Sequence, residues 1–224
     1  MSPPPAQAPS IRWRWLGTVA YRPTLERQRQ HRQDVLAGRA QPELWLLEHP
    51  PVVTEGRRPP PIPTPVELLA QHGIDWVRTE RGGLATYHGP GQLVGYLIAD
   101  IERLSLGVKA TVAALEQGLI RWLALHDVQA GLRDGYPGVW VGRAKIAAVG
   151  LNFQRGVSMH GFALNLTTDL SPYALFVPCG IRDGEVTSLV KLRGPSAPTP
   201  ATAAPQLARE ILAALGASDA CPPG

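Results

Sequence analysis

The sequence is poor in cysteine and in long apolar runs, and each shortage excludes a class of protein. Its 224 residues include only Cys179 and Cys221, too few for a disulfide framework or a cysteine-rich zinc site. No uncharged apolar run approaches the roughly 20 residues that a membrane helix needs. Met1–Ser10 has no basic region followed by an apolar stretch, so no secretory signal is indicated. We therefore expect a soluble, cytoplasmic domain that binds no metal and no membrane.

Lysine is also scarce, although the chain is basic. There are 22 Lys+Arg against 18 Asp+Glu, a formal net charge of +4, and only Lys109, Lys145 and Lys191 are lysines. Lysine can lose its proton when buried, whereas arginine effectively cannot. Each retained lysine is therefore a candidate for a role that arginine cannot fill. The excess positive charge favours an acidic partner, whether nucleic acid, a membrane surface or an acidic protein.

The composition that is present suits one domain with many loops. Hydrophobic residues make up 44% of the chain, enough for a core, and Gly and Pro number 23 each. Periodicity predicts strands over 11–21, 43–48, 51–54, 74–79, 92–100, 139–141, 144–153 and 159–166, and helices over 24–38, 64–71, 108–127 and 206–215. Thr64 and Glu67 match a capping box. Adjacent strand runs with few helices between them predict an α+β fold with a mixed or largely antiparallel sheet.

The densest candidate for a binding site is the segment RGGLATYHGPGQ at 81–92. Four glycines and one proline within twelve residues allow unusual backbone angles and close approach of a ligand to the main chain. The alternative is a bulged hairpin loop whose polar groups satisfy its own backbone. The segment matches neither G-x-G-x-x-G nor a P-loop, so no nucleotide site is indicated.

Two further residues are candidates for chemistry. Lys145 follows a hairpin turn at the start of an apolar strand; if it points inward, desolvation makes it a proton acceptor, whereas an outward lysine would be a surface residue. Cys179 stands between proline and glycine, and a nucleophilic cysteine needs a base or a positive neighbour to form thiolate. Lys145, His88 and His160 are candidates for that neighbour. The alternative is a buried structural cysteine.

The order and spacing of these segments are specific. They read RGGLATYHGPGQLVGY at 81–96, GRAKIAAVGL at 142–151, SMHGFALNL at 158–166, SPYALFVPCGI at 171–181 and EVTSL at 185–189. Over roughly residues 11–192 the chain closely resembles the octanoyl-[acyl-carrier-protein]:protein octanoyltransferases of lipoate biosynthesis. The resemblance implies a biotin/lipoate protein-ligase (class II synthetase-like) fold, a mixed sheet flanked by helices. We expect a disordered extension at 1–10, a catalytic domain at 11–193, and a linker, terminal helix and tail at 194–224.

The resemblance also implies an activity. These enzymes move an octanoyl group from the phosphopantetheine of acyl carrier protein to a lysine of lipoyl domains, in dehydrogenase E2 subunits or the glycine-cleavage H protein, with no ATP and no cofactor. Cys179 matches their acyl-thioester nucleophile and Lys145 the lysine that lowers its pKa. The residues that match the substrate-lining segments are Arg81, Gly82, Gly83, Leu84, Ala85, Thr86, Tyr87, His88, Ala148, Val149, Gly150, Gly161, Phe162 and Ala163. Ala148 stands where a serine is frequent in the family. The Pro-rich loop 57–63 also differs from the family's usual insert.

Three other functions remain to be weighed. An ATP-dependent lipoate or biotin ligase would use a lysine but no covalent cysteine. A Cys–His hydrolase would use His88 or His160 as base and release free fatty acid. A nucleic-acid-binding module is suggested by RWRW at 12–15, which is better explained as a strand with alternating exposed arginines. We expect a monomer without a nucleic-acid partner.

Overall fold

The computed structural model describes residues 9–58, 62–176 and 185–220. Its main sheet has eight strands in the order β10-β8-β9-β6-β2-β1-β11, with β7 paired to β8. The bounds are β1 Ser10–Thr18, β2 Glu43–Glu48, β6 Gln92–Ile98, β7 Val139–Val141, β8 Ala144–Gln154, β9 Val157–Asn165, β10 Glu185–Val186 and β11 Ser218–Asp219. Both parallel and antiparallel pairs occur: β1 pairs with β2 in parallel, and β6, β9 and β8 pair antiparallel. The predicted mixed sheet is confirmed.

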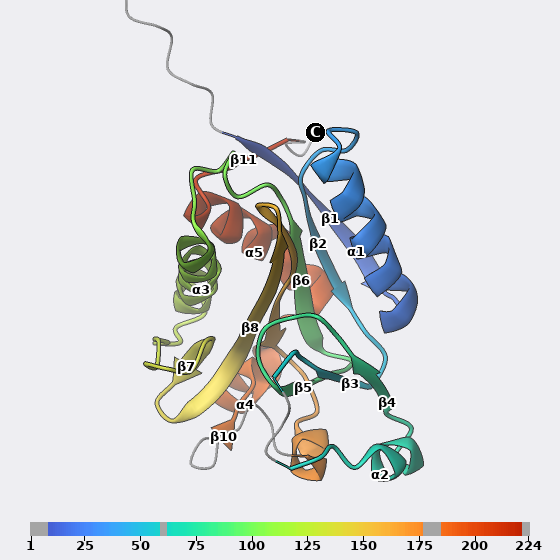
Figure 1. Cartoon of the computed structure of the whole chain (residues 1–224). Coiled ribbons are helices and arrows are strands. Elements are labelled where there is room, and N and C mark those ends of the chain that lie inside the picture. Colours follow the sequence, from blue (N-terminus) through green and yellow to red (C-terminus); the bar gives the residue numbers. More distant parts are fainter. Residues whose placement is uncertain (1–8, 59–61, 177–184, 221–224) are drawn as a thin grey trace, which may run out of the picture.

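Helices cover both faces of this sheet (Figure 1). They are α1 Tyr21–Leu36, α2 Val66–Gln71, α3 Val108–Ala124, α4 Leu189–Arg193 and α5 Pro200–Ala214, with short 3₁₀ turns η1 Ser171–Leu175 and η3 Gly194–Ser196. Helix α1 packs on one face, where Leu25 joins a cluster with Leu47 and Ile98. Helices α3 and α5 pack on the other face, where the largest core cluster contains Trp122 and Ile211. The hydrophobic core therefore lies in two layers, one on each side of the sheet.

Three strands form a second, smaller sheet that the sequence did not indicate. β3 Val52–Glu55 pairs with β4 Asp75–Arg78 in parallel and with β5 Ala85–His88 antiparallel. Strand β5 lies inside the glycine-rich segment, so that segment is part strand and part loop. The small sheet lies at the lower end of the molecule in Figure 1, beside β6 and β8. It thereby brings the glycine-rich segment against the main sheet.

Two local predictions were wrong. The Thr64 hydroxyl donates to the Glu55 carboxylate, and α2 begins after Pro65 with no side-chain cap, so the capping box does not form. Helix α5 begins at Pro200 with the Thr199 hydroxyl accepting from the Thr202 backbone N–H, six residues earlier than expected. Proline in the first helical turn needs no N–H partner, which is why this Pro- and Ala-rich stretch supports a helix.

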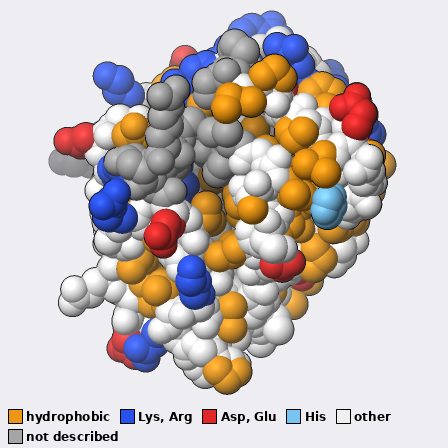
Figure 2. All heavy atoms as spheres, turned by 90° about the horizontal axis from the view of Figure 1, so that it is seen from below, with side chains coloured by type: hydrophobic (Ala, Val, Ile, Leu, Met, Phe, Trp, Pro, Cys, Tyr) orange, Lys and Arg blue, Asp and Glu red, His pale blue; other side chains and the backbone are white. Residues whose placement is uncertain are grey.

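Helix α2 presents apolar side chains to solvent at the lower end of the molecule. Val66 and Leu68 are each 37% exposed, and Ile62 before the helix is 60% exposed. Seen from below, hydrophobic side chains gather across this face between scattered charged ones (Figure 2). In the described part of the chain, no helix has the length and apolar character to cross a membrane.

Candidate active site

A cavity of about 660 Å³ lies between the glycine-rich segment and the strands β8 and β9. Its volume is within the range of small-molecule sites, roughly 300–1,000 Å³. Strands β5 and β6, the start of α3 and the loop at 135–137 complete the wall. Residues far apart in sequence thus converge on one cavity.

Most of the residues expected to bind substrate line this cavity. Twelve do so: Arg81, Gly82, Gly83, Leu84, Thr86, His88, Ala148, Val149, Gly150, Gly161, Phe162 and Ala163. Lys145 lines it as well, whereas Cys179 lies outside the described residues. Ala85 and Tyr87 are not brought into the cavity. They pack in a separate cluster with Val53 and Phe176, because successive side chains of a strand point to opposite faces.

The glycine-rich loop is held on β8 by close backbone contact. The Gly82 N–H donates to the Leu151 carbonyl at 2.9 Å. A Cβ on Gly150 would lie 2.9 Å from the Gly82 carbonyl oxygen, closer than such contacts permit. Only glycine at position 150 lets the loop approach this closely. The Gly82 N–H is already engaged, so it is not available to stabilise an oxyanion.

The Arg81 side chain holds the same loop against β3. Its guanidinium donates to the Thr54 hydroxyl at 3.0 and 3.1 Å and to the Gly82 carbonyl at 3.0 Å. Arg81 is only 8% exposed. These bonds tie β3 of the small sheet to the loop, and they satisfy a buried cation as burial requires.

Lys145 has the inward orientation that makes it a candidate for proton transfer. It is 7% exposed, its Nζ donates to the Pro137 carbonyl at 3.0 Å, and the Trp140 ring centroid lies 4.9 Å away. The same residue pairs in register with Val186 of β10, seven positions after Cys179 in the sequence. The described chain that follows Cys179 in the sequence therefore resumes beside Ala144 and Lys145 of β8.

A continuous hydrogen-bond network connects the glycine-rich segment to that backbone. His88 Nδ1 is 2.7 Å from the Gln92 amide oxygen, and the Gln92 Nε2 donates to Asn165 at 2.9 Å. Asn165 Nδ2 donates to the Thr187 carbonyl at 3.0 Å, and the Thr187 N–H donates to the Lys145 carbonyl at 2.9 Å. Four strands are cross-linked in this way, so the position of the Lys145 backbone is determined from two sides.

Three buried histidines lie in and behind the cavity. Burial lowers the pKa of His49 to about 4 and the pKa of His88 and of His160 to about 3. His49 donates from Nδ1 to the Val19 carbonyl at 2.6 Å, and its Nε2 lies 2.7 Å from the Tyr96 hydroxyl. All three imidazoles are therefore neutral at physiological pH.

His160 differs from the other two because its ring has no hydrogen-bond partner among the described residues. Both nitrogens are buried and unpaired, and Glu80 Oε2 lies 4.0 Å from Nε2. The backbone has φ of +64°, a conformation that is rare for a non-glycine residue and costly without support. The ring lines the cavity, so its nitrogens are available to a molecule bound there.

Sequence reasoning missed several other lining residues. Tyr21 and Tyr96 line the wall beside His160. Burial raises the pKa of Tyr21 to about 12 and that of Tyr96 well above its usual value, so both remain hydroxyl donors. Tyr96 closes the quoted glycine-rich motif, but Tyr21 precedes it by 60 residues, and no local pattern connects Tyr21 to the site.

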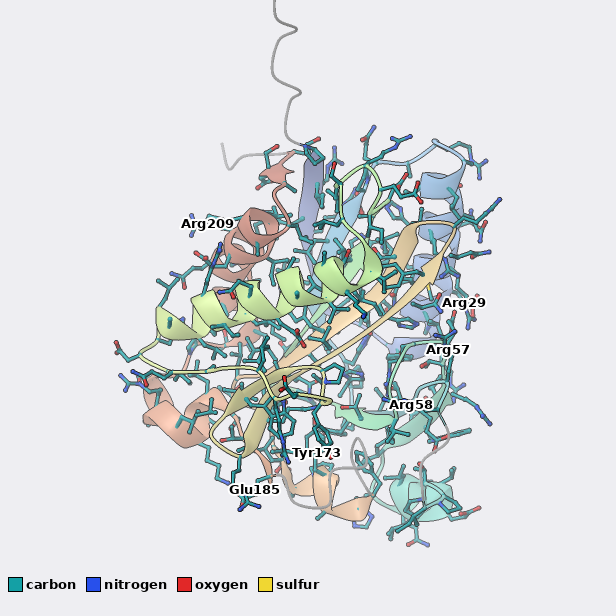
Figure 3. All side chains as sticks on the ribbon, turned by 60° about the vertical axis from the view of Figure 1, so that its left-hand side comes forward. Arg29, Arg57, Arg58, Tyr173, Glu185 and Arg209 are labelled. Atoms are coloured by element: carbon teal, nitrogen blue, oxygen red, sulfur yellow. The ribbon has the colours of Figure 1, made fainter. Side chains whose placement is uncertain are left out.

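The cavity has an apolar wall and a basic rim. The apolar side chains are Leu84, Val108, Val112, Val149, Leu151, Phe153 and Phe162. Ile146 and Ala147, which precede Ala148 on β8, are in the core instead. Arg57 and Arg58 line the cavity from an exposed position, and Figure 3 shows them on the same flank as Arg29. No group of three His, Cys, Asp or Glu within the described ranges could hold a metal ion.

Comparison with known proteins decides the family. The sequence model of the lipoyl protein ligase A/B catalytic domain matches residues 20–212. The octanoyltransferase of Dechloromonas aromatica is 47% identical over 168 residues, 74% of this chain and 78% of its own. The octanoyltransferase of Ectopseudomonas mendocina is 41% identical over 208 residues, 93% and 98% of the two chains. The chain belongs to the octanoyltransferase family.

Solved structures agree on the fold of this octanoyltransferase-family chain. The bipartite lipoate protein ligase of Thermoplasma acidophilum covers 94% of this chain and 86% of its own, with a TM-score of 0.67 and 16% identity. The biotin protein ligase of Aquifex aeolicus in complex with biotin and ATP covers 91% and 70%, with a TM-score of 0.53 and 12% identity. The predicted biotin/lipoate protein-ligase fold is confirmed. The enzyme is an acyltransferase, and the cavity is the place in its fold where an apolar wall meets a buried lysine.

Proposed function

We propose that this enzyme transfers an octanoyl group from octanoyl-acyl carrier protein to a lysine of lipoyl domains, through a thioester on Cys179 and without ATP. The observation that carries the proposal is the placement of Lys145: a buried amine in the wall of a largely apolar cavity, next to the strand that follows Cys179 in the sequence. The high identity to octanoyltransferases supports the acyl group. We further propose that the enzyme is a cytoplasmic monomer and that it catalyses the first step of endogenous protein lipoylation.

In the first half-reaction the Cys179 thiolate attacks the carbonyl carbon of the donor thioester. A new carbon–sulfur bond forms to Cys179, the carbon–sulfur bond to pantetheine breaks, and Lys145 returns a proton to the departing thiolate. A thioester is exchanged for a thioester, so no activation by ATP is required. The scarcity of lysine in the chain supports this role, because arginine could carry the charge but could not exchange the proton.

In the second half-reaction the amine of the acceptor lysine attacks the Cys179 thioester. The carbon–nitrogen bond forms, the carbon–sulfur bond to Cys179 breaks, and the amine's proton passes to Lys145 while Cys179 leaves as thiolate. An amide is more stable than a thioester, which makes this step favourable. The same lysine thus gives a proton in one half-reaction and takes one in the other.

The cavity supports an acyl chain of medium length. Leu84, Val149 and Phe162 supply apolar surface, and each buried CH₂ gives about 0.8 kcal/mol. His160, Tyr21 and Tyr96 also line the cavity, and burying further methylenes against the unpaired ring nitrogens of His160 is unfavourable. This polar part of the cavity wall therefore favours acyl chains too short to reach it.

Two rival functions fit less well. A Cys–His hydrolase needs an imidazole that binds a proton near neutral pH, yet the pKa values of His88 and His160 are about 3. A nucleic-acid module based on the N-terminal strand is disfavoured because Arg14 of that strand donates to Glu43 at 2.7 and 3.0 Å. An ATP-dependent ligase shares the fold, and it differs in its acyl donor and in using no covalent cysteine.

The test therefore compares donors. Purified enzyme and a lipoyl domain are mixed with octanoyl-acyl carrier protein in the absence of ATP, and in parallel with octanoic acid and MgATP. The proposal expects the lipoyl domain to gain one octanoyl group, measured by intact mass, only with the carrier-protein donor. Modification that requires octanoic acid and ATP would mean a ligase, and release of free octanoic acid without modification would mean a hydrolase.

A further inference from the structure

A buried carboxylate on helix α3 lies opposite Lys145 across a single peptide group. Glu116 is 7% exposed, and its Oε1 accepts from the Gly138 N–H at 2.7 Å. The carbonyl of the same peptide group, that of Pro137, accepts from Lys145 Nζ at 3.0 Å. The N–H and C=O of a planar trans peptide point in opposite directions. Glu116 and Lys145 therefore hold this peptide group from its two sides.

The backbone at Gly138 has little conformational freedom. Gly138 has φ of +121°, and a Cβ there would lie 2.4 Å from the Ala147 carbonyl oxygen. Position 138 therefore requires glycine, and its N–H faces helix α3 rather than the neighbouring strand. Without Glu116 that N–H would be a buried donor with no partner in the described structure, at a cost comparable to a lost hydrogen bond.

Burying a carboxylate is expensive, and an apolar side chain would fill the same place on α3 at lower cost. Burial raises the pKa of Glu116, while the Gly138 N–H and the Lys145 ammonium oppose the rise. In either protonation state a carboxyl oxygen still accepts a hydrogen bond. A carboxyl group at position 116 can therefore accept the Gly138 N–H, whereas an apolar side chain cannot.

We propose that Glu116 is a positioning residue: by holding the 137–138 peptide group, it aims the Pro137 carbonyl at Lys145 and so fixes the amine in the wall of the acyl cavity. Lys145 comes from β8, the peptide group from the loop before β7, and Glu116 from α3. Contacts among these three elements thereby determine the position of the Lys145 Nζ. This inference rests on the proposed function for its catalytic consequence, but the geometry it claims can be measured without catalysis.

The catalytic arm of the test measures formation of the Cys179 thioester from octanoyl-acyl carrier protein. Glu116→Gln keeps an oxygen that accepts from Gly138, whereas Glu116→Met has similar length and no such acceptor. We expect Glu116→Met to slow acylation between about 10- and 100-fold, the size of effect that a small misplacement of a reacting group produces, with the KM for the donor little changed. Glu116→Gln should restore most of the rate. Gln117→Leu, at the neighbouring exposed position of α3, is the control and should behave as wild type.

The second arm needs no substrate. The chain's only other lysines, Lys109 and Lys191, are exposed and serve as internal standards for labelling by an amine-reactive ester, followed by peptide mass spectrometry. In Glu116→Met the labelling of Lys145 should rise severalfold relative to both standards, and in Glu116→Gln it should stay near wild type. If Glu116→Met does not fold, Glu116→Asp replaces it, since the shorter side chain withdraws the acceptor and keeps the charge.

The outcomes separate the two proposals. Unchanged Lys145 labelling in both Glu116→Met and Glu116→Asp would overturn the positioning role, whatever the enzyme's activity. Loss of folding stability in Glu116→Met with a wild-type acylation rate would also overturn it, because a merely structural residue behaves in that way. Altered labelling with no acyl-enzyme even in wild type would leave the geometry established and remove the proposed function.

Discussion

The imidazole of His88 and the side-chain amide of Gln92 share a 2.7 Å hydrogen bond in which Gln92 can only accept, because its nitrogen is committed to Asn165 and to the Tyr87 carbonyl. The proton of His88 therefore resides on Nδ1, and Nε2 faces the Thr54 hydroxyl at 3.4 Å. His88 is held in one neutral tautomer, and its hydrogen bond to Gln92 connects the small sheet to β6. It is not a proton carrier.

The first prediction concerns stability in mild acid. The folded pKa values of His49, His88 and His160 lie at about 4, 3 and 3, below the unfolded value of 6.5. Below pH 6.5 the unfolded chain therefore binds more protons than the folded one, and the free energy of unfolding falls. Each histidine removes up to about 1.4 kcal/mol for each pH unit below 6.5, until its folded pKa is reached. Urea unfolding at pH 7.5, 6.5 and 5.5 measures this slope.

The matched variants are His160→Gln and His72→Gln, the latter at an exposed position of the chain. His160→Gln should make the dependence on pH shallower, and His72→Gln should leave it unchanged. A free energy of unfolding that stays constant from pH 7.5 to 5.5 would contradict the neutral, buried state of these side chains.

The second prediction concerns the proton at Lys145. Arginine at this position keeps the positive charge but does not titrate. Lys145→Arg should lower the rate of octanoyl transfer by about 100-fold or more, as removal of general acid–base catalysis does. The measurement is transfer to a lipoyl domain under single-turnover conditions, with Lys191→Arg as the exposed control. Near-normal transfer by Lys145→Arg would mean that charge alone suffices.

The third prediction concerns the contact between the glycine-rich loop and β8. In Gly150→Ala the new methyl group meets the Gly82 carbonyl oxygen at 2.9 Å, so the loop must move away from the strand. We expect transfer to fall about 10-fold, because the cavity wall shifts, while stability changes by only about 1 kcal/mol. Gly131→Ala is the control, since nothing lies within 4 Å of a Cβ there. Equal activity of the two variants would show that the loop position does not matter.

The fourth prediction concerns the basic rim. Arg57 and Arg58 stand exposed at the cavity, and Arg209 lies on the opposite side of the molecule (Figure 3). The double variant Arg57→Gln/Arg58→Gln should lower kcat/KM for the carrier-protein donor at low salt, and less so as salt screens the interaction. Octanoyl-pantetheine, which has neither phosphate nor protein, should react equally well with both enzymes. Arg209→Gln should match wild type, and an equal loss with both donors would show that the arginines shape the cavity instead.

The sequence allowed much of the fold to be predicted, because its signals were local. The hairpin turn at Gly142 joins β7 and β8 as expected, since Val141 pairs with Ala144 and Gly142 has φ of +59°. Helix α3 follows its apolar spacing. The early start of α5 has a local cause, its N-terminal proline and threonine cap, whereas in two other cases long-range contacts outweighed a local pattern. Thr64 bonds Glu55 instead of capping α2, and β5 forms in the glycine-rich segment because β3 is there to pair with it.

The site could be predicted only in part, for the same physical reason. A motif gives the order of residues, but strand alternation decides which of them face the cavity. Thr86 and His88 face it, whereas Ala85 and Tyr87 face the small sheet's own core. Tyr21 and Glu116 lie in helices with no motif of their own, and only the packing of those helices brings them to the site.

The most direct test of the account is the intact mass of the enzyme after mixing with octanoyl-acyl carrier protein in the absence of ATP, for wild type and for Cys179→Ser. The account predicts one octanoyl increment on wild type that hydroxylamine removes and that passes to an added lipoyl domain, with no thioester on the variant. Full transfer to the lipoyl domain by Cys179→Ser, or an increment on wild type that resists hydroxylamine and never passes on, would contradict it.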